Sequence, residues 1–471
     1  MYMTLNPEAW AEEMFSACEL GDKRRTNRLI EMASRLCRTV GESMSHCCHG
    51  DESALEGAYR FIRNDMISPS SIAEGIFKST EKRIPSNKTL LAIQDSTTLG
   101  FQHSVKEELG DLGGPADSNT KGFHVHSVLL LDAESDKTIG LIDQMRWQRK
   151  QESRGSRHER KGRSYEAKES FKWECSSRRV STRLSSHISN VISVCDRESD
   201  IYEYLCYQET LGQRYIIRAS QNRCLESSDK EKLLDALEGS PSLGVYQVRV
   251  LQKSGRQARI AEVELRSCRV MLRCPRRMKG EESLPIEVNV VCATERNAGS
   301  SVEALSWVLL TSEPVESFES ARLVTSYYEK RWRIEDFHKA WKTGAGAEEQ
   351  RMQHSGNLER MLVILSSIAI RLLQLKEGLE KEEESGSNSL DCTTLLTDSE
   401  WKVLWLSSQG KKKKRLPEKI PKIGWAYKAV AKLGGWSDSK RIGRASWETI
   451  WKGWYRLQER VEGYILLKNG A

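Results

Sequence analysis

The stretch Tyr328 to Lys342 reads YEKRWRIEDFHKAWK and decides how the fold of the whole chain is interpreted. On a helix at about 100° per residue, its polar residues Tyr328, Arg331, Glu335 and Lys342 fall within an arc of about 60°. Apolar residues in and before the stretch fall on a separate face, as docking on a core requires, and they are Leu323, Ile334, Phe337 and Trp341. The sequence therefore predicts a helix with one packing face and one narrow polar face.

The spacing of the polar face leaves two interpretations open. A solvated helix with ion pairs four residues apart gives the same pattern. A working face of a binding or catalytic site also fits, because a phenol, two cations and a carboxylate share it. The rest of the chain decides between them.

The polar face fills every position of the pattern Y-x2-R-x3-E-x6-K, and so resembles the signature of the DDE transposases of the insertion-sequence-four family. Other stretches resemble the same family: EGAYRFIRN (Glu56 to Asn64), HVHSVLLL (His124 to Leu131), SNVISVCDRESD (Ser189 to Asp200), LLTSEPVES (Leu309 to Ser317), FHKAWKTGAGAE (Phe337 to Glu348) and ASWETIWKGW (Ala445 to Trp454). The resemblance covers nearly the whole chain and implies an α/β fold with a ribonuclease H-like catalytic core.

Composition agrees with a large intracellular protein that binds a polyanion. A chain of 471 residues suggests two to four domains. The formal charge of +7 conceals local clusters of Arg and Lys, which suit nucleic acid. Twelve irregularly spaced cysteines without a secretory signal predict reduced thiols in the cytoplasm, and the resemblance places the protein with the bacterial nucleoid. His46 to His49 (HCCH) is not expected to bind zinc, because adjacent ligands close a tetrahedron poorly.

Residues 1–70 are predicted to form an N-terminal helical domain. The segment Gly21 to Arg38 forms an amphipathic helix with a basic outer face, which a plain solvated helix would also show. The resemblance implies that this segment binds the transposon end through Arg24, Arg25 and Arg28.

Residues 71–210 are predicted to form the first part of the catalytic core. Apolar runs of strand length at Leu90 to Phe101, Phe123 to Asp132 and Lys137 to Trp147 predict an antiparallel meander. After the charged stretch Arg146 to Arg179, a weaker DNA-binding candidate or a solvated loop, a fourth strand at Val191 to Asp196 ends in an acid. This order of elements is that of a ribonuclease H-like core, which residues 309–375 are expected to complete.

Residues 211–308 are predicted to form a β-rich insertion domain, with strands at Arg214 to Ser220, Gly244 to Gln252, Ala258 to Arg266 and Ile286 to Glu295. Residues 376–471 are predicted to form a C-terminal helical domain. It begins with a charged, Ser-rich linker, Lys376 to Ser389, and contains the basic run Lys411 to Arg415. The apolar run Met361 to Leu375 is too short for a bilayer, so it predicts a buried helix and no membrane partner. The resemblance assigns dimer contacts to the C-terminal domain.

The resemblance implies that Asp95, Asp196 and Glu335 are the catalytic acids. Two divalent ions about 3.5 to 4 Å apart can organise phosphodiester transfer, and Mg²⁺ prefers carboxylate ligands and water. The expected cofactor is therefore two Mg²⁺ ions per site, with Mn²⁺ as a substitute. Nearby acids are interpreted as solvated or salt-bridged residues, and these are Glu198, Asp200 and Asp336.

The remaining predicted site residues hold DNA. Arg331 can grip a phosphate through two parallel hydrogen bonds, and Lys342, Tyr328 and Arg351 add further contacts. Trp307 matches the family tryptophan that stacks on a flipped base during hairpin formation, although without the resemblance it would be interpreted as a core residue.

The predicted function is cut-and-paste transposition by a homodimer that binds transposon-end DNA and target DNA. Two alternatives are a binding-only regulator and a metal-dependent nuclease without strand transfer. The regulator is disfavoured because the N-terminal segment and all three acids are present, and the nuclease because the signature is complete and Trp307 is present.

Overall fold

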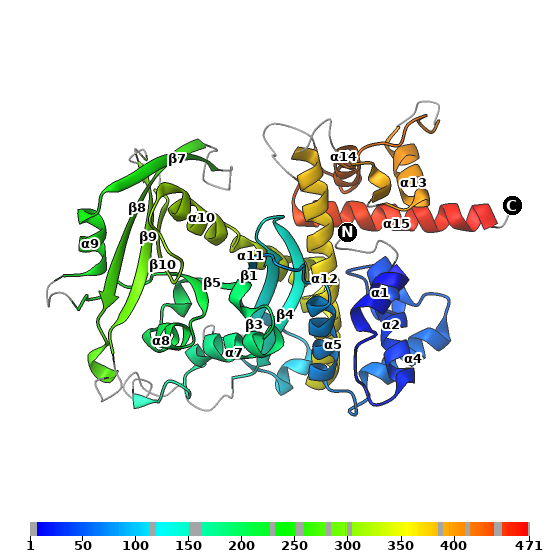
Figure 1. Ribbon diagram of the computed structural model, residues 1–471. Helices are drawn as coiled ribbons and strands as arrows, with labels where there is room; N and C mark the ends of the chain where they lie inside the picture. The colour runs from blue at the N-terminus through cyan, green and yellow to red at the C-terminus, as the bar shows by residue number, and fades with distance from the viewer. Residues whose placement is uncertain are drawn as a thin grey trace.

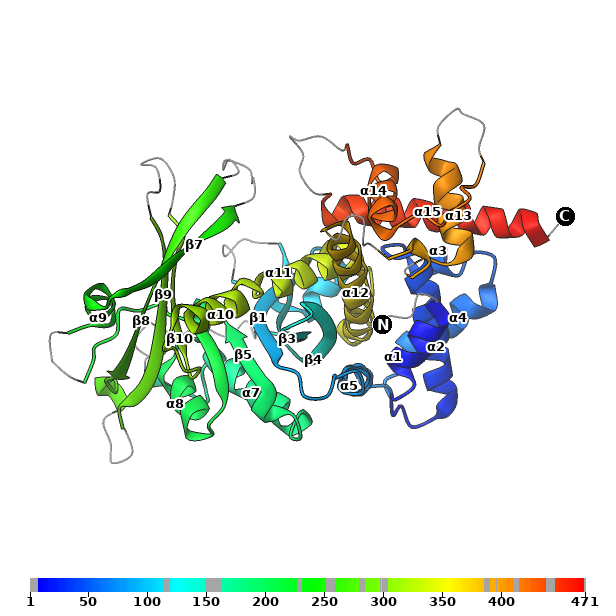
Figure 2. The ribbon, with the colours of Figure 1, turned by 45° about the horizontal axis from the view of Figure 1, so that its top comes forward.

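The computed structural model describes residues 7–113, 119–149, 162–226, 231–250, 259–278, 284–296, 298, 304–384, 390–394, 396–409, 415–437 and 445–469. A long helix, α12 (Ser355–Glu384), stands near the middle of the molecule (Figure 1). A large sheet lies on one side of α12, the N-terminal helices lie on the other side, and the C-terminal helices gather near one end of it. The same arrangement is seen after a turn of 45° (Figure 2).

Five helices form the N-terminal part of the chain, and they are α1 (Pro7–Phe15), α2 (Lys23–Arg38), α3 (Met44–Cys47), α4 (Glu52–Ile62) and α5 (Pro69–Glu81). The predicted amphipathic helix is therefore confirmed as α2. Its Leu29, Met32 and Leu36 side chains are buried, and the Asp22 side chain caps its first turn by accepting from the Arg24 N–H.

A buried arginine joins the N-terminal helices to α12. Arg360 donates to the backbone oxygens of Ile62 and Ile67 at 2.8 and 2.6 Å, and pairs with Asp65 at 2.9 Å. A buried guanidinium needs such partners for its N–H groups. The segment after α4 is therefore fixed against α12.

The core strands are β1 (Leu90–Phe101), β2 (Gly110–Asp111), β3 (Lys121–Asp132), β4 (Lys137–Trp147), β5 (Val191–Cys195) and β6 (Arg214–Arg218). β1 and β4 have the bounds that the sequence predicts. β3 pairs antiparallel with both β1 and β4, whereas β1, β5 and β6 run parallel in that order.

Strands from the predicted insertion continue the same sheet, and they are β7 (Ser242–Val250), β8 (Arg259–Leu272), β9 (Ile286–Arg296) and β10 (Ser306–Thr311). β10 pairs with β6 on one side and with β9 on the other. The sheet order is β2-β3-β1-β5-β6-β10-β9-β8-β7, with β4 beside β3. The insertion strands therefore extend the core sheet, and the predicted boundary at residues 308 and 309 falls inside β10. The strand predicted at Arg214 to Ser220 as part of the insertion is instead β6, which pairs parallel with β5 in the core. Helix α9 (Leu233–Gly239) lies beside β8 (Figure 1).

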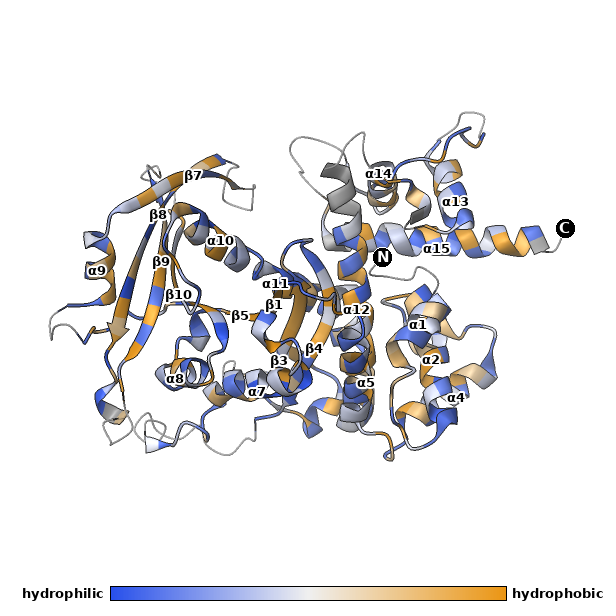
Figure 3. Ribbon diagram, in the orientation of Figure 1, coloured by the Kyte–Doolittle hydropathy of each residue, from blue (hydrophilic) through white to orange (hydrophobic). Residues whose placement is uncertain are grey.

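Helices cover both faces of the core sheet because its strands are apolar on both faces. On one face, Leu90 and Ala92 of β1 join Val180 of α7 (Lys172–Arg183) in one apolar cluster. On the other face, Leu91 and Ile93 belong to a cluster that contains residues of α11 (Trp332–Lys339). Helix α8 (Tyr202–Thr210) follows β5. Figure 3 shows hydrophobic residues along the core strands and the adjoining part of α12.

The remaining helices are α10 (Phe318–Glu329), α13 (Asp398–Ser408), α14 (Ile423–Leu433) and α15 (Trp447–Asn469). The predicted buried helix is confirmed within α12, which continues to Glu384 into the expected linker. This extension is anchored by Glu377, whose buried carboxylate accepts from Thr138 N–H at 2.9 Å and pairs with Arg333 at 2.5 Å. Residues 385–389 of the linker and Lys411 to Lys414 of the basic run lie outside the described residues.

Within the described parts of the chain, no helix combines the length and the apolar composition needed to cross a bilayer.

Candidate active site and DNA-binding surface

Two of the predicted acids lie side by side at one end of the parallel strands. The parallel register pairs Ile93 of β1 with Val194 of β5. Asp95 and Asp196 each stand two residues further along, so they occupy matching positions on neighbouring strands, which are about 4.8 Å apart. Asp196 directly follows β5 and caps the short helix η4 (Arg197–Ser199).

The third acid joins this pair through an arginine. Glu335 lies on α11, and its carboxylate pairs with the guanidinium of Arg331 four residues earlier. The same guanidinium lies 3.3 Å from the Asp95 carboxylate. Arg331 is buried, so water screens these contacts weakly. The structure therefore brings Asp95, Asp196 and Glu335 to one place, with Arg331 between two of them.

The pKa of the Asp95 carboxyl is raised to about 6, mainly by burial and also by the neighbouring Asp196 carboxylate. The Ser96 N–H donates to Asp95 at 2.7 Å, and this bond together with Arg331 limits the rise. Burial also raises the pKa of Asp196, against a hydrogen bond from the Glu198 N–H at 2.9 Å. Because the surroundings of both carboxyls disfavour their negative charge, a cation bound between them would be stabilising.

The predicted single helix from Tyr328 to Lys342 is broken, and this corrects the sequence interpretation. α10 ends at Glu329, α11 begins at Trp332, and η6 (Ala340–Gly344) is a π-helical turn. Between α10 and α11 the N–H groups of Lys330 and Arg331 bond to carbonyls three residues earlier, which tightens the turn. The π turn widens the helix, so Lys342 is shifted around the axis relative to the predicted polar face.

The predicted packing face is right for three residues and wrong for the fourth. Ile334, Phe337 and Trp341 are buried, and the Trp341 indole donates to the Leu362 oxygen on α12 at 3.0 Å. Leu323 is instead 49% exposed. It belongs to α10, whose axis is set independently by the break before α11.

The structure places Trp307 next to Tyr328. Trp307 lies on β10 and Tyr328 in the last turn of α10, with ring centroids 5.8 Å apart and planes at 63°. Trp307 is half-buried and Tyr328 is buried. Asp196 and Arg331 both act on the pKa of Tyr328, which burial raises. The aromatic pair therefore adjoins the acids.

The three N-terminal arginines have different surroundings. The Arg24 side chain is 91% exposed and pairs only loosely with its own cap, Asp22, at 3.1 Å. Arg28 pairs with Glu31 at 2.7 Å. Arg25 donates to the Leu20 backbone oxygen at 2.9 Å, which fixes the loop before α2. Arg24 is thus the most accessible of the three to a phosphate, and Arg25 has a local structural role.

Arg351 lies in the exposed connection between η7 (Ala347–Glu349) and α12. Four described arginines of the stretch Arg146 to Arg179 are paired with acids: Arg146 with Glu359, Arg149 with Glu169, Arg178 with Glu174 and Arg179 with Asp143. Residues 150–161 of that stretch lie outside the described residues.

The acids set aside as salt-bridged residues are paired in the structure. Glu198 lies 3.2 Å from Lys172, and Asp336 lies 3.6 Å from Lys376. Asp200 is completely buried and pairs with Arg223 at 2.5 Å. Asp200 also accepts from the Ser220 and Gln221 N–H groups, and so ties the segment that carries Asp196 to the loop after β6.

Trp147, Arg149 and Lys172 line a cleft near the acids. The sequence indicates them only collectively, as part of the weaker DNA-binding candidate Arg146 to Arg179, and does not single them out. All three residues lie at or near the ends of elements: Trp147 is the last residue of β4, Arg149 follows β4, and Lys172 is the first residue of α7. Because residues at strand ends meet at one edge of a sheet, their positions in the sequence could have indicated that they belong to one site.

The donor atoms fit a hard divalent cation held by few protein ligands. As the side chains stand, no three His, Cys, Asp or Glu residues in the described chain are grouped so that they could hold one metal ion. Mg²⁺, however, is commonly held by one or two carboxylates with water completing its shell. Asp95 with Asp196, and Asp95 with Glu335, are carboxylate pairs of that kind. Binding of a cation between Asp95 and Glu335 would require the Arg331 guanidinium to move away from the Glu335 carboxylate.

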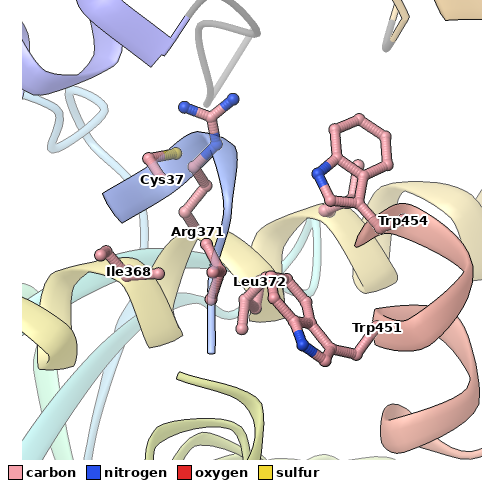
Figure 4. A pocket seen from close by; sticks show the side chains of 8 residues that line it. Cys37, Ile368, Arg371, Leu372, Trp451 and Trp454 are labelled. Carbon is pink, nitrogen blue, oxygen red and sulfur yellow. The ribbon is translucent and has the colours of Figure 1, made fainter. Parts of the chain in front are cut away.

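A second concavity lies where the N-terminal helices, α12 and α15 meet (Figure 4). Cys37 of α2, Arg371 and Leu372 of α12, and Trp451 and Trp454 of α15 line it. Most of these groups are apolar, and the Arg371 guanidinium lies over the Trp10 ring. We interpret this place as a packing junction between the two ends of the chain.

Comparison with known families adds one finding at the N-terminus. Residues 7–67 match a family model described as transposase DNA-binding. The matched segment begins with α1 and ends just after α4, and it contains the exposed face of α2 with Arg24 and Arg28. The match supports a DNA transposase as the class of this protein, with transposon DNA as a partner.

Proposed function

We propose that this chain is a cut-and-paste DNA transposase of the DDE type, similar to the insertion-sequence-four family. It would bind the terminal inverted repeats of its element, cleave them by metal-dependent hydrolysis, and join the freed 3′-OH ends to target DNA. The observation that carries the proposal is the convergence of Asp95, Asp196 and Glu335 with Arg331, in a chain whose N-terminus matches a transposase DNA-binding segment.

The strand order supports a ribonuclease H-like core. β4-β3-β1-β5-β6 has an antiparallel meander on one side and parallel strands on the other. The first acid lies on the first long strand and the second acid follows the first parallel neighbour. The third acid comes from a helix packed on the sheet. Carboxylates from three separate elements therefore lie around Arg331, which supports a two-ion site for phosphodiester chemistry once Arg331 releases Glu335.

Asp95, Asp196 and Glu335 would hold two Mg²⁺ ions, or Mn²⁺ in their place, with Asp95 shared between them. When bound, these ions supply an activated water or 3′-OH and stabilise the leaving oxygen. The protein groups then have defined tasks. Ser96 and Glu198 N–H groups orient the two aspartates, and the apolar sheet behind them limits access of water to the carboxylates.

Arg331 would act as a phosphate clamp. In the free protein its guanidinium is engaged by Asp95 and Glu335. A bound cation would compete for these carboxylates, and a scissile phosphate would then offer the guanidinium a bidentate partner. Tyr328 would donate to a neighbouring phosphate, and Lys342 and Arg351 would add positive charge further along the DNA. The clamp holds the strand in line with the nucleophile.

Trp307 supports a hairpin step. Its half-buried ring stands beside Tyr328 near the acids, and an aromatic surface there can hold a base displaced by a sharp bend of the terminal DNA. The free 3′-OH would then attack the opposite strand, and a second hydrolysis would open the hairpin.

A homodimer would hold the two transposon ends together. Exposed apolar residues at the end of α15, Ile465, Leu466 and Leu467, support a role of this helix in contacts between protomers. Target DNA would enter after both ends are cut.

The test uses the purified protein and labelled DNA that carries the two ends of the element encoding it. With Mg²⁺ we expect nicks that leave 3′-OH ends, followed by hairpins, released ends and joining to a plasmid, and none of these with a chelator. Nicks without hairpins or joined products would instead assign a nuclease. Binding without any cleavage would assign a regulator.

A further inference from the structure

A polar cleft of about 660 Å³ is lined by residues that follow two of the proposed catalytic acids, Asp95 and Asp196, in the chain. Ser96 and Thr97, which follow Asp95 on β1, line one wall, and Glu198, two residues after Asp196, lines another. The opposite wall is formed by the end of β4 and the start of α7. Side chains alternate along a strand, so Ser96 lies on the α7 face of β1 and Asp95 on the α11 face. The cleft adjoins the acids through Glu198, whose N–H donates to Asp196 at 2.9 Å and whose carboxylate lies 3.2 Å from Lys172.

The sheet order places this cleft and Trp307 on opposite sides of the acids. Trp307 lies on β10, which is separated from β5 by β6. The cleft is lined by residues of β1, β3 and β4, which extend the sheet in the other direction. A DNA strand held by Trp307 and Tyr328 with its scissile phosphate at the acids would reach the cleft by passing the end of β5, which stops at Cys195 while β1 continues to Phe101.

The cleft contains a flat aromatic surface. His124 of β3 and Trp147 of β4 face each other in register. Their rings are stacked, with centroids 5.5 Å apart and planes at 22°. Lys172 Nζ lies 5.9 Å from the Trp147 ring and 5.7 Å from the Trp173 ring. Aromatic rings with a cation alongside form the usual platform for unpaired bases and their phosphates.

Two cations of the cleft are held by carboxylates that can move away. Two of the three guanidinium nitrogens of Arg149, Nε and Nη2, lie 2.5 Å from Glu169, and Lys172 lies 3.2 Å from Glu198. The two glutamate side chains are 45% and 65% exposed. The glutamates are the more exposed partners, whereas Arg149 and Lys172 are 35% and 13% exposed. A phosphate that replaced either carboxylate would keep the cation paired, and Arg149 can bind a phosphate with the same two parallel hydrogen bonds.

We propose that this cleft binds the DNA strand on the side of the scissile phosphate away from the transposon end. The same chemistry, phosphates on Arg149 and Lys172 with an unstacked base near Trp147, would serve flanking donor DNA before cleavage and target DNA afterwards. The proposal rests on the proposed function. It predicts binding without base-specific hydrogen bonds, because the groups that line the cleft offer charge and stacking surface.

The test compares Lys172→Gln, Arg149→Gln and Trp147→Leu with the wild type, and uses Lys88→Gln as a matched control. Lys88 also pairs with an exposed glutamate, Glu134, but it precedes β1 at the far end from Asp95. Each protein is titrated with a precut end duplex and with the same duplex extended by flanking DNA. Strand transfer of precut ends into a plasmid forms the second arm.

Affinity for the extended duplex should fall while affinity for the precut duplex stays constant. Each lost phosphate contact should lower the slope of log affinity against log salt by about 0.9, and Trp147→Leu should cost about five- to 150-fold. If the variants lose only affinity for the extended duplex, the cleft binds flanking donor DNA. If strand transfer into the plasmid also falls, the cleft binds both flanking DNA and target DNA.

Unchanged behaviour of all three variants in both arms would overturn the proposal. So would an equal loss on precut and extended duplexes with an unchanged melting temperature, since that places the residues at the transposon end. If a variant melts at a lower temperature, Trp147→Phe and Arg149→Lys replace it, and retained stacking or charge should restore binding to the extended duplex. Failure of the proposed function would be recognised separately, because the wild-type protein would then neither nick nor join DNA. The binding titrations would still test the cleft, since they require no cleavage.

Discussion

The Arg331 guanidinium lies 3.3 Å from the Asp95 carboxylate, although the two residues are 236 positions apart in the chain. The same guanidinium pairs with Glu335. One guanidinium therefore pairs with two of the three acids in the protein without DNA. Under the proposed function, a metal ion would compete for these carboxylates and a phosphate would compete for the guanidinium.

This arrangement predicts two opposite effects of Arg331→Ala. Nicking should slow by about 100-fold or more, because a charged donor to the reacting phosphate is lost. Half-maximal nicking should nevertheless need less Mg²⁺, because no guanidinium competes for Asp95 and Glu335. A Mg²⁺ titration of single-turnover nicking measures both. Slower nicking with an increased Mg²⁺ requirement would mean that Arg331 helps to assemble the metal site.

Trp307 should matter for hairpin formation more than for the first nick. Nicking needs a held phosphate, metal ions and water, whereas the hairpin also needs a base kept out of the stack. Stacking on an aromatic ring is worth about 1 to 3 kcal/mol, so Trp307→Ala should slow hairpin formation by roughly five- to 150-fold. A denaturing-gel time course should show nicked DNA accumulating. Equal slowing of both steps would make Trp307 a packing residue of β10.

The N-terminal arginines should separate into two groups. Arg24→Ala and Arg28→Ala should weaken binding to an isolated end and lower the salt slope by about 0.9 for each phosphate contact. Arg25→Ala should also lower the melting temperature, because its guanidinium donates to the Leu20 oxygen. Gel-shift titrations at several salt concentrations and thermal melting test this. Unchanged affinity and salt slope in all three variants would exclude α2 as the end-binding surface.

Asp200 should be important for stability although it is not a catalytic acid. Its carboxylate is completely buried against Arg223, and removal of one partner from a buried pair costs about 3 to 5 kcal/mol. Asp200→Ala should lower the free energy of unfolding by that amount in a urea titration. Glu134→Ala, which removes an exposed pair with Lys88, should change it by less than about 1 kcal/mol. Similar effects of the two variants would contradict this role.

The sequence was sufficient to predict the strands that carry the acids. β1 and β4 have the expected bounds because long apolar runs end in clear breaks, and Asp95 and Asp196 were placed correctly on or after their strands. The break at Lys330 and the π turn at Ala340 to Gly344 were not predicted. The prediction from helical spacing assumes that the whole stretch shares one regular helix axis. No residue in the stretch indicates locally where tertiary packing breaks or widens the helix.

Contacts between distant segments could not be predicted from the sequence either. The pairing of β10 with β6 merges the insertion strands with the core sheet, and no local pattern specifies which edge a strand will join. The stacking of His124 on Trp147 depends on the register between β3 and β4, which two irregularities in their pairing adjust. The sequence supplied these residues, and the register brought them together beside the acids.

The most direct test of the proposed chemistry is the rate at which acid variants nick a labelled transposon end in Mg²⁺. Asp95→Ala, Asp196→Ala and Glu335→Ala should each abolish nicking while gel shifts show unchanged end binding. Asp336→Ala should remain close to the wild type, because the neighbouring Asp336 carboxylate is directed to Lys376. Nicking by Asp95→Ala at near the wild-type rate would contradict the assignment of these three carboxylates to the catalytic site.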